Sequence, residues 1–144
     1  MILEIENCIL QDTNNARGVK GKIMVERNEL LDTLARKHSQ DMARSGNVDH
    51  VDSRGRELKH RIPLTIDVQG RSYQAAENIG MIPLGRVEGL GIIKNTGPSI
   101  GNAFVESWMG SDGHRTNILG DYAMIGIGVA LKGIRYYATQ VFFK

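Results

Sequence analysis

This sequence has one cysteine, no long apolar run and almost no excess of charge of either sign. Each of these features excludes a class of protein. Cys8 is the only cysteine in 144 residues, so no intrachain disulfide can form and a disulfide-dense secreted scaffold is excluded. No apolar run approaches the roughly 20 residues that a membrane-spanning helix needs. The 18 basic and 16 acidic residues leave a net charge of only +2. Because the basic residues are also scattered, we expect no nucleic-acid partner.

Motifs that identify an enzyme class are also missing. The sequence contains no P-loop, GxSxG, CxxC or HExxH motif, and the glycines at 85, 89 and 91 do not form a dinucleotide-binding fingerprint. The first ten residues include Glu4 and Glu6 but no basic residue, which is the wrong character for a signal peptide. We therefore expect either a cytosolic protein or a mature domain cut from a longer precursor.

The composition that remains is typical of a globular protein. Apolar residues make up 41% of the chain and charged residues 24%, both close to globular averages. A chain of 144 residues has the usual size of one domain, and a chain of this size buries roughly 68–70% of its unfolded surface. We expect one domain spanning residues 1–144.

Apolar residues at helical spacing predict three main helices. The first begins near Ile2 and ends around residues 14–18, and the second covers residues 30–44. The third begins at Pro98, where the missing N–H of proline costs nothing, and ends at Trp108. A shorter helix over residues 56–62 would stop before Pro63, because the residue before a proline avoids helical backbone angles.

The C-terminal part of the chain predicts an antiparallel hairpin. Residues 124–131 and 135–143 are both rich in β-forming residues, and a short link containing glycine joins them. The first run alternates bulky residues with Gly126, Gly128 and alanine, so another backbone or helix can approach its bare face closely. The glycine-rich stretch 81–97 predicts a long loop that includes a short irregular strand. The sum is an α+β fold, with helices flanking a small antiparallel sheet.

Three of the four histidines have simple structural interpretations. His38 follows Leu34 by one turn on an apolar helix face, which predicts a packed core histidine. His60 lies in a charged stretch and is expected to be solvated. His50 follows a helix end, and a histidine in such a loop is more often a surface residue than a ligand.

His114 has more functional potential, because it follows a Ser-Asp-Gly turn. Ser111 or Asp112 can cap a helix that starts here, and the positive end of that helix disfavours imidazolium. We therefore expect a neutral ring, the form that binds a metal or accepts a proton. A role limited to capping or packing the turn is equally compatible with these residues.

The acidic candidates are Glu77 and Glu106. Glu77 stands among alanine, isoleucine and glycine, so it is expected to be either exposed or deliberately paired. Glu106 falls on the polar side of the third helix and is interpreted as solvated. The separations between His50, Glu77 and His114 match no zinc-ligand spacing, so spacing alone does not define a metal site.

Several segments, in the same order, resemble those of the CAP superfamily, also called the SCP or cysteine-rich secretory protein, antigen 5 and pathogenesis-related 1 family. The resemblance covers nearly the whole chain and implies a three-layer α–β–α sandwich in a family whose members are mostly exported. One segment is similar to the short, prokaryotic form of the family's tryptophan-to-histidine signature. The matching segments are Thr13–Arg17, Leu34–Ala43, Asp49–His50, Ala76–Ile79, Trp108–Leu119 and Met124–Ala130 with Tyr136–Phe142.

The resemblance also implies a solvent-accessible central cleft that holds two histidines and two glutamates. Some members bind zinc or another divalent cation there through the histidines. His50, Glu77 and His114 match three of the four positions, whereas Ser111 occupies the position of the second glutamate, with Asp112 beside it. This departure weakens any mechanism that needs two carboxylates.

Three functions remain open at this stage. The leading hypothesis is a cleft in which His50 and His114 bind Zn²⁺, another divalent metal or a small ligand, with Glu77 as a ligand, an orienting group or a base. The second is a metal-assisted hydrolase or peptidase in which Glu77 takes a proton from bound water. The third is a lipid- or partner-binding module that uses apolar residues of the 81–97 loop, although we favour packing of those side chains into the core.

Overall fold

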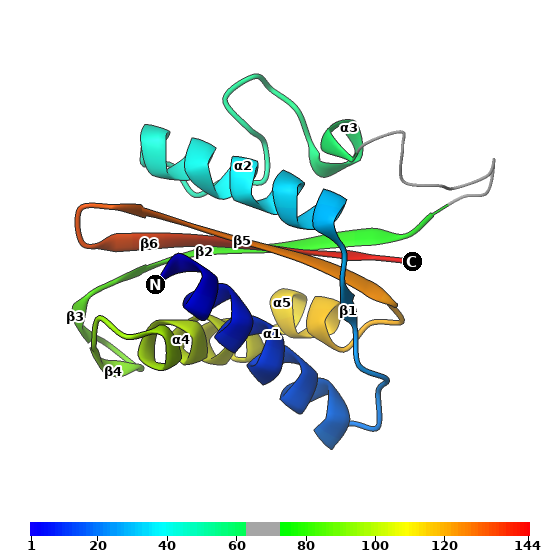
Figure 1. Ribbon diagram of the computed structural model, residues 1–144, viewed down its shortest axis with the longest axis horizontal. Helices are drawn as coiled ribbons and strands as arrows, with labels where there is room; N and C mark the ends of the chain where they lie inside the picture. The colour runs from blue at the N-terminus through cyan, green and yellow to red at the C-terminus, as the bar shows by residue number, and fades with distance from the viewer. Residues whose placement is uncertain (63–72) are drawn as a thin grey trace.

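The computed structural model describes residues 1–62 and 73–144, which form two helical layers around a four-stranded sheet (Figure 1). Helix α2 covers one face of the sheet, and α1, α4 and α5 lie on the other side. The predicted α–β–α arrangement is therefore confirmed. Among the described residues, no helix is long and apolar enough to cross a membrane. In chain order the elements are α1 (Ile2–Val19), β1 (Glu26–Arg27), α2 (Glu29–Ser45), α3 (Leu58–Arg61), β2 (Ala75–Pro83), β3 (Gly85–Val87), β4 (Gly91–Ile93), α4 (Gly97–Met109), α5 (Asp112–Ile118), β5 (Met124–Lys132) and β6 (Arg135–Phe143).

The main sheet has the strand order β1-β5-β6-β2. Strands β5 and β6 form the antiparallel hairpin that the sequence predicts, and β2 runs antiparallel to β6 on its other side. Strand β1 is parallel to β5 but covers only Met124 and Ile125. Most of the outer edge of β5 therefore has no strand beside it.

The 81–97 stretch contains strands where its glycines predict a long loop with one short irregular strand. Strand β2 continues to Pro83, and β3 and β4 then pair as a small antiparallel ribbon. The pattern of β2 is hard to recognise because polar Glu77 and Asn78 are buried in its middle, where groups from distant segments satisfy them. Packing into the core is confirmed for Ile82 and Ile93, whereas Ile92 is exposed.

Helix α1 continues one residue beyond its predicted end, to Val19. The buried Arg17 explains this continuation, because its guanidinium donates hydrogen bonds to several backbone carbonyls, including Ile118 O at 2.7 Å and Gly120 O at 2.8 Å. These bonds fix the last turn of the helix against the segment after α5. Cys8, on the same helix, is half-buried.

Helix α2 packs closely on the bare face of β5, as the glycine alternation predicts. A Cβ added to Gly126 would lie 2.2 Å from the Leu31 carbonyl carbon, and one added to Gly128 would lie 2.1 Å from the Arg36 backbone nitrogen. The helix begins at Asn28, whose side chain accepts from the Leu31 N–H at 3.1 Å. The two glycines thus determine how near α2 can come to the sheet.

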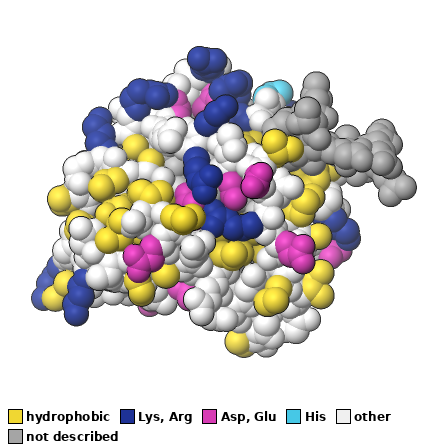
Figure 2. All heavy atoms as spheres, viewed as in Figure 1, with side chains coloured by type: hydrophobic (Ala, Val, Ile, Leu, Met, Phe, Trp, Pro, Cys, Tyr) yellow, Lys and Arg dark blue, Asp and Glu magenta, His cyan; other side chains and the backbone are white. Residues whose placement is uncertain are grey.

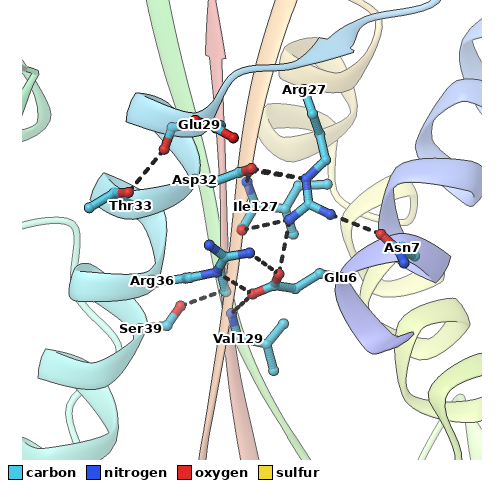
Figure 3. A network of polar contacts seen from close by, with 11 residues as sticks. Glu6, Asn7, Arg27, Glu29, Asp32, Thr33, Arg36, Ser39, Ile127 and Val129 are labelled. Carbon is cyan, nitrogen blue, oxygen red and sulfur yellow. Dashed lines mark hydrogen bonds and ion pairs between the residues drawn. The ribbon is translucent and has the colours of Figure 1, made fainter. Parts of the chain in front are cut away.

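Two carboxylates occupy the outer edge of β5 beyond the short β1 (Figure 3). The Val129 N–H donates to Glu6 Oε2 at 3.2 Å, and the Ile127 N–H donates to Asp32 Oδ1 at 2.9 Å. Unpaired backbone groups at a sheet edge otherwise invite pairing with another chain. The carboxylates therefore replace the hydrogen bonds of a missing strand.

The carboxylate of Glu6 is also the centre of an ionic network. Glu6 is fully buried and accepts from Arg27 Nη2 at 2.9 Å and from Arg36 Nη2 at 2.7 Å. Because Glu6 belongs to α1 and Arg36 to α2, the contact joins the two helical layers around the sheet edge (Figure 3). Acidic and basic side chains meet in the middle of this face of the molecule (Figure 2).

The close approach of α2 predicts that Gly128→Ala destabilises the protein. The new methyl group would overlap backbone atoms that cannot rotate away, and we expect a loss of at least about 2 kcal/mol in the free energy of unfolding. Urea denaturation measures this loss. The control is Gly18→Ala in α1, where nothing lies within 4 Å, and which should gain about 0.5–1 kcal/mol. Unchanged stability of Gly128→Ala would contradict the close packing.

The ionic network predicts that Glu6→Ala is strongly destabilising. Removal of one partner leaves two guanidinium groups and the Val129 N–H without their shared acceptor, and breaking a buried pair in this way costs about 3–5 kcal/mol. The matched control is Glu106→Ala, because Glu106 is exposed as predicted and should change stability by less than about 0.5 kcal/mol. The same urea titration compares the two variants, and equal effects would contradict the role of Glu6.

Candidate functional site

The candidate site is centred on Glu77 in strand β2. Its side chain is only 2% exposed, and its Oε1 lies 3.0 Å from Nδ1 of His50, whose side chain is 57% exposed. His50 lies in the segment that follows α2, so the fold brings together two residues that are 27 positions apart. Of the two alternatives predicted for Glu77, exposed or paired, the structure shows the paired one.

Arg61, the last residue of α3, is a further member of the site. Its Nη1 donates to Glu77 Oε2 and its Nη2 to Glu77 Oε1, both at 2.9 Å. Nη2 also donates to the backbone carbonyl of His50 at 2.8 Å. The guanidinium therefore binds the carboxylate through two parallel hydrogen bonds, a geometry that arginine provides and lysine does not.

These contacts set the protonation of Glu77 and His50. Burial alone would raise the pKa of Glu77, but the hydrogen bonds from His50 and Arg61 outweigh it and lower the pKa below its ordinary value. The hydrogen bond to Glu77 raises the pKa of His50, against a smaller lowering by burial. Glu77 is therefore ionised at neutral pH, and His50 is a more basic histidine than an isolated one.

His114 lies in α5 next to this pair. Its backbone carbonyl accepts from Asn78 Nδ2 at 3.0 Å, which places α5 against β2. Burial lowers the pKa of His114, and the nearby charge of His50 lowers it further. The direction agrees with the neutral ring expected from the sequence, although burial rather than the helix dipole is the main cause that the structure supplies. Within the described residues, no hydrogen bond joins the His114 ring to His50 or Glu77.

Ser111 does not take over the role of a second carboxylate. It is exposed and stands at the start of α5, where its side chain forms no capping hydrogen bond. Asp112 instead pairs with Arg115 at 2.7 Å on the surface. In the part of the chain that the structure describes, the cleft thus has one central carboxylate, and Arg61 neutralises it.

Two asparagines form side-chain hydrogen bonds with the backbone of Glu77 and His114. Asn117 Nδ2 donates to Asn78 Oδ1 at 2.9 Å, and the fully buried Asn78 donates to Gln140 Oε1 at 2.9 Å. Asn78, Asn117 and Arg61 are not among the candidate site residues that the sequence predicts. Asn78 stands beside Glu77, but the contacts of Arg61 and Asn117 span 16 and 39 residues, so no local pattern indicates them.

The other two histidines have the positions that the sequence predicts. His38 is 2% exposed, and its Nε2 lies 2.7 Å from the carbonyl oxygen of Asp49. His60 is exposed. Neither ring bonds to Glu77 among the described contacts.

An open groove of about 780 Å³ runs beside the pair formed by His50 and Glu77. Its walls include Tyr73, Lys59 and Asn117. A small ligand in this groove would meet the exposed edge of the His50 ring. The buried carboxylate of Glu77 lies behind that ring and is held by Arg61.

This arrangement allows Glu77 to orient a metal-binding histidine but not to bind the metal itself. A carboxylate that accepts from one ring nitrogen leaves the other nitrogen available for a metal, and here Nε2 of His50 is that nitrogen. Both oxygens of Glu77 are already held by Arg61. Across residues 1–62 and 73–144, no group of three or more His, Cys, Asp or Glu side chains is arranged to hold a metal ion. The described residues therefore contain no closed metal site, and the imidazoles of His50 and His114 remain as candidate ligands.

Comparisons with known proteins assign the family. The model of the cysteine-rich secretory protein family, CAP, matches residues 10–142. The uncharacterized membrane protein YlbC of Bacillus subtilis (strain 168) is 33% identical over 141 residues, which are 96% of this chain and 34% of the relative. The chain thus spans about a third of that relative.

Solved structures support the fold. An extracellular protein containing an SCP domain from Bacillus anthracis superposes with a TM-score of 0.75 at 24% identity, over 99% of this chain and 41% of that one. An outer surface protein of Borrelia burgdorferi also superposes with a TM-score of 0.75, at 16% identity, over 98% of this chain and 92% of that one. At these identities the likeness extends to the fold alone.

The electrostatics of the site predict two separate histidine titrations. In NMR titrations His50 should titrate above the ordinary pKa of about 6.5 and His114 below it, and Glu77→Gln should bring the pKa of His50 down. Because the pKa of His50 is raised in the folded state, its contribution to stability is fully present below the unfolded pKa and is lost as the pH rises through the folded pKa. His60→Ala identifies the resonance of the exposed His60. An unchanged His50 pKa in Glu77→Gln would contradict the pairing.

Proposed function

Because the chain belongs to the cysteine-rich secretory protein (CAP) family, we propose that it is a binding domain whose cleft takes its ligand on His50 and His114. The observation that supports this is the 3.0 Å contact between His50 Nδ1 and the buried Glu77. It fixes the ring and leaves Nε2 open to the groove. Arg61 holds the carboxylate, so the whole arrangement exists before a ligand arrives, which lowers the cost of binding.

A divalent cation such as Zn²⁺ suits these two rings. In the neutral ring of His50, the Nδ1–H group donates a hydrogen bond to Glu77. The lone pair on Nε2 is then available to the metal. His114 is kept neutral by burial and so also offers a lone pair. Water or a second ligand would complete the coordination shell, as at open zinc sites. With two protein ligands, the affinity should be lower than that of a four-ligand structural site.

Binding is better supported than hydrolysis. A general base works best when its pKa lies near the operating pH, whereas the pKa of Glu77 is lowered and both of its oxygens are engaged. The position at which the family often has a second glutamate is Ser111, which lies exposed at the start of α5. No other observation favours an enzyme, so we propose no reaction.

Titration calorimetry of Zn²⁺ into the metal-stripped protein tests the proposal. We expect saturable one-site binding that His50→Ala and His114→Ala each abolish, because each variant leaves a single imidazole. Glu77→Gln should weaken binding by about 10–100-fold, the effect usual for a group that orients a ligand. His60→Ala is the matched control and should bind Zn²⁺ normally. Binding that persists in both single variants, or no binding in the wild type, would reject the metal site.

A further inference from the structure

A second cavity, of about 430 Å³, lies between α2 and the segment from Asp52 to Arg61. Its lining is markedly basic, and the acidic residues there, Asp41 and Asp52, already accept hydrogen bonds from protein groups. In the space-filling view, Lys and Arg side chains gather over α2 and the loop that follows it (Figure 2). The basic lining residues are Lys37, Arg44, Arg54, Arg56 and Arg61.

Two buried polar atoms among the residues that line this cavity have no hydrogen-bond partner within the described chain. They are Nε of Arg61 and Nδ1 of His38. The side chain of Arg61 is 6% exposed and His38 is 2% exposed. Buried polar groups without a partner are rare, because each one loses the hydrogen bonds that it makes with water in the unfolded chain. Both atoms belong to residues that line this cavity, so a ligand that enters it is a candidate partner for both.

The two atoms have opposite hydrogen-bonding roles. Nε of Arg61 always carries a hydrogen and can only donate. Nε2 of His38 faces the carbonyl oxygen of Asp49, which only accepts, so that nitrogen carries the ring hydrogen. Burial lowers the pKa of His38, so the ring is neutral and its Nδ1 is an acceptor.

We propose that this cavity binds inorganic phosphate as hydrogen phosphate, with a phosphate oxygen accepting from Arg61 Nε and the P–OH hydrogen donated to His38 Nδ1. The surrounding basic residues favour an anion, and the acceptor on His38 requires that this anion carry a hydrogen. Sulfate has the same shape but no hydrogen near neutral pH. The site is separate from the metal-binding function proposed above, although Arg61 contributes to both places.

The rim of the cavity can admit an anion. Lys37 and Arg54 are exposed and form no ion pair with the described residues. Their charges are therefore available to an anion that enters the cavity. Arg44 and Arg56 already pair with Asp41 and Asp52, so the free positive charge is that of Lys37 and Arg54.

Calorimetric titration of the full chain at pH 7.5 with sodium phosphate and, separately, with sodium sulfate at equal ionic strength tests the proposal. We expect saturable phosphate binding and sulfate binding at least tenfold weaker. A phosphomonoester, whose second pKa is about 6, is mostly without its hydrogen at this pH and should resemble sulfate. Equal affinity for phosphate and sulfate, or for phosphate and the monoester, would overturn the assignment, as would no phosphate binding.

Variants separate the cavity from general attraction of anions. Lys37→Gln/Arg54→Gln should weaken phosphate binding at least tenfold, whereas Arg86→Gln/Lys94→Gln removes the same charge from exposed positions outside the cavity and should not. An equal effect of the two double variants would overturn the site.

A substitution of His38 tests the acceptor directly. In His38→Gln the amide nitrogen can still donate to the Asp49 carbonyl, but the acceptor at Nδ1 is gone. We expect this variant to lose the preference for phosphate over sulfate. A buried water that bridges Arg61 and His38 would satisfy both atoms equally well. In that case the wild type would show no phosphate binding, and the proposal is rejected whatever the outcome of the zinc titration.

Discussion

The edge of β5 is the constraint on which the arrangement of the layers depends. Strand β1 covers only two residues of that edge, and the N–H groups beyond it are satisfied by Glu6 and Asp32 from helices on opposite faces of the sheet. The carboxylate of Glu6 can be buried there because Arg27 and Arg36 pair with it. Two carboxylates thus close the edge of the sheet, and one of them, that of Glu6, also joins α1 to α2.

At the opposite edge of the sheet, a buried glutamate is again paired with an arginine, but its other contacts differ. Strand β2 ends the strand order, and its Glu77 is also buried and paired with an arginine. Here, however, one carboxylate oxygen also faces His50, whose ring is exposed. The ion pair at β5 joins two helices, whereas the ion pair at β2 holds an exposed histidine at the surface. Arg61 then connects this histidine with the basic cavity under α2.

Much of the fold follows from local patterns in the sequence. The α1, α2 and α4 helices and the β5–β6 hairpin were predicted because each has a clear apolar period, and the Gly126 and Gly128 alternation indicated the close approach of α2. The pattern failed at β2, where Glu77 and Asn78 interrupt the alternation, and at β3 and β4, where glycines suggest a loop. In each case contacts with distant segments override the local signal.

The sequence by itself determined the α+β class through its periodicity, and the resemblance of its motifs to the family implied the three layers and the candidate residues His50, Glu77 and His114. Only the tertiary structure decided what those residues do together. The partner of Glu77 is Arg61, which lies 16 positions away in the chain, and the unpaired atoms of Arg61 and His38 are defined only by what surrounds them. Hydrogen bonds and burial depend on distances in space, and spacing along the chain does not determine those distances.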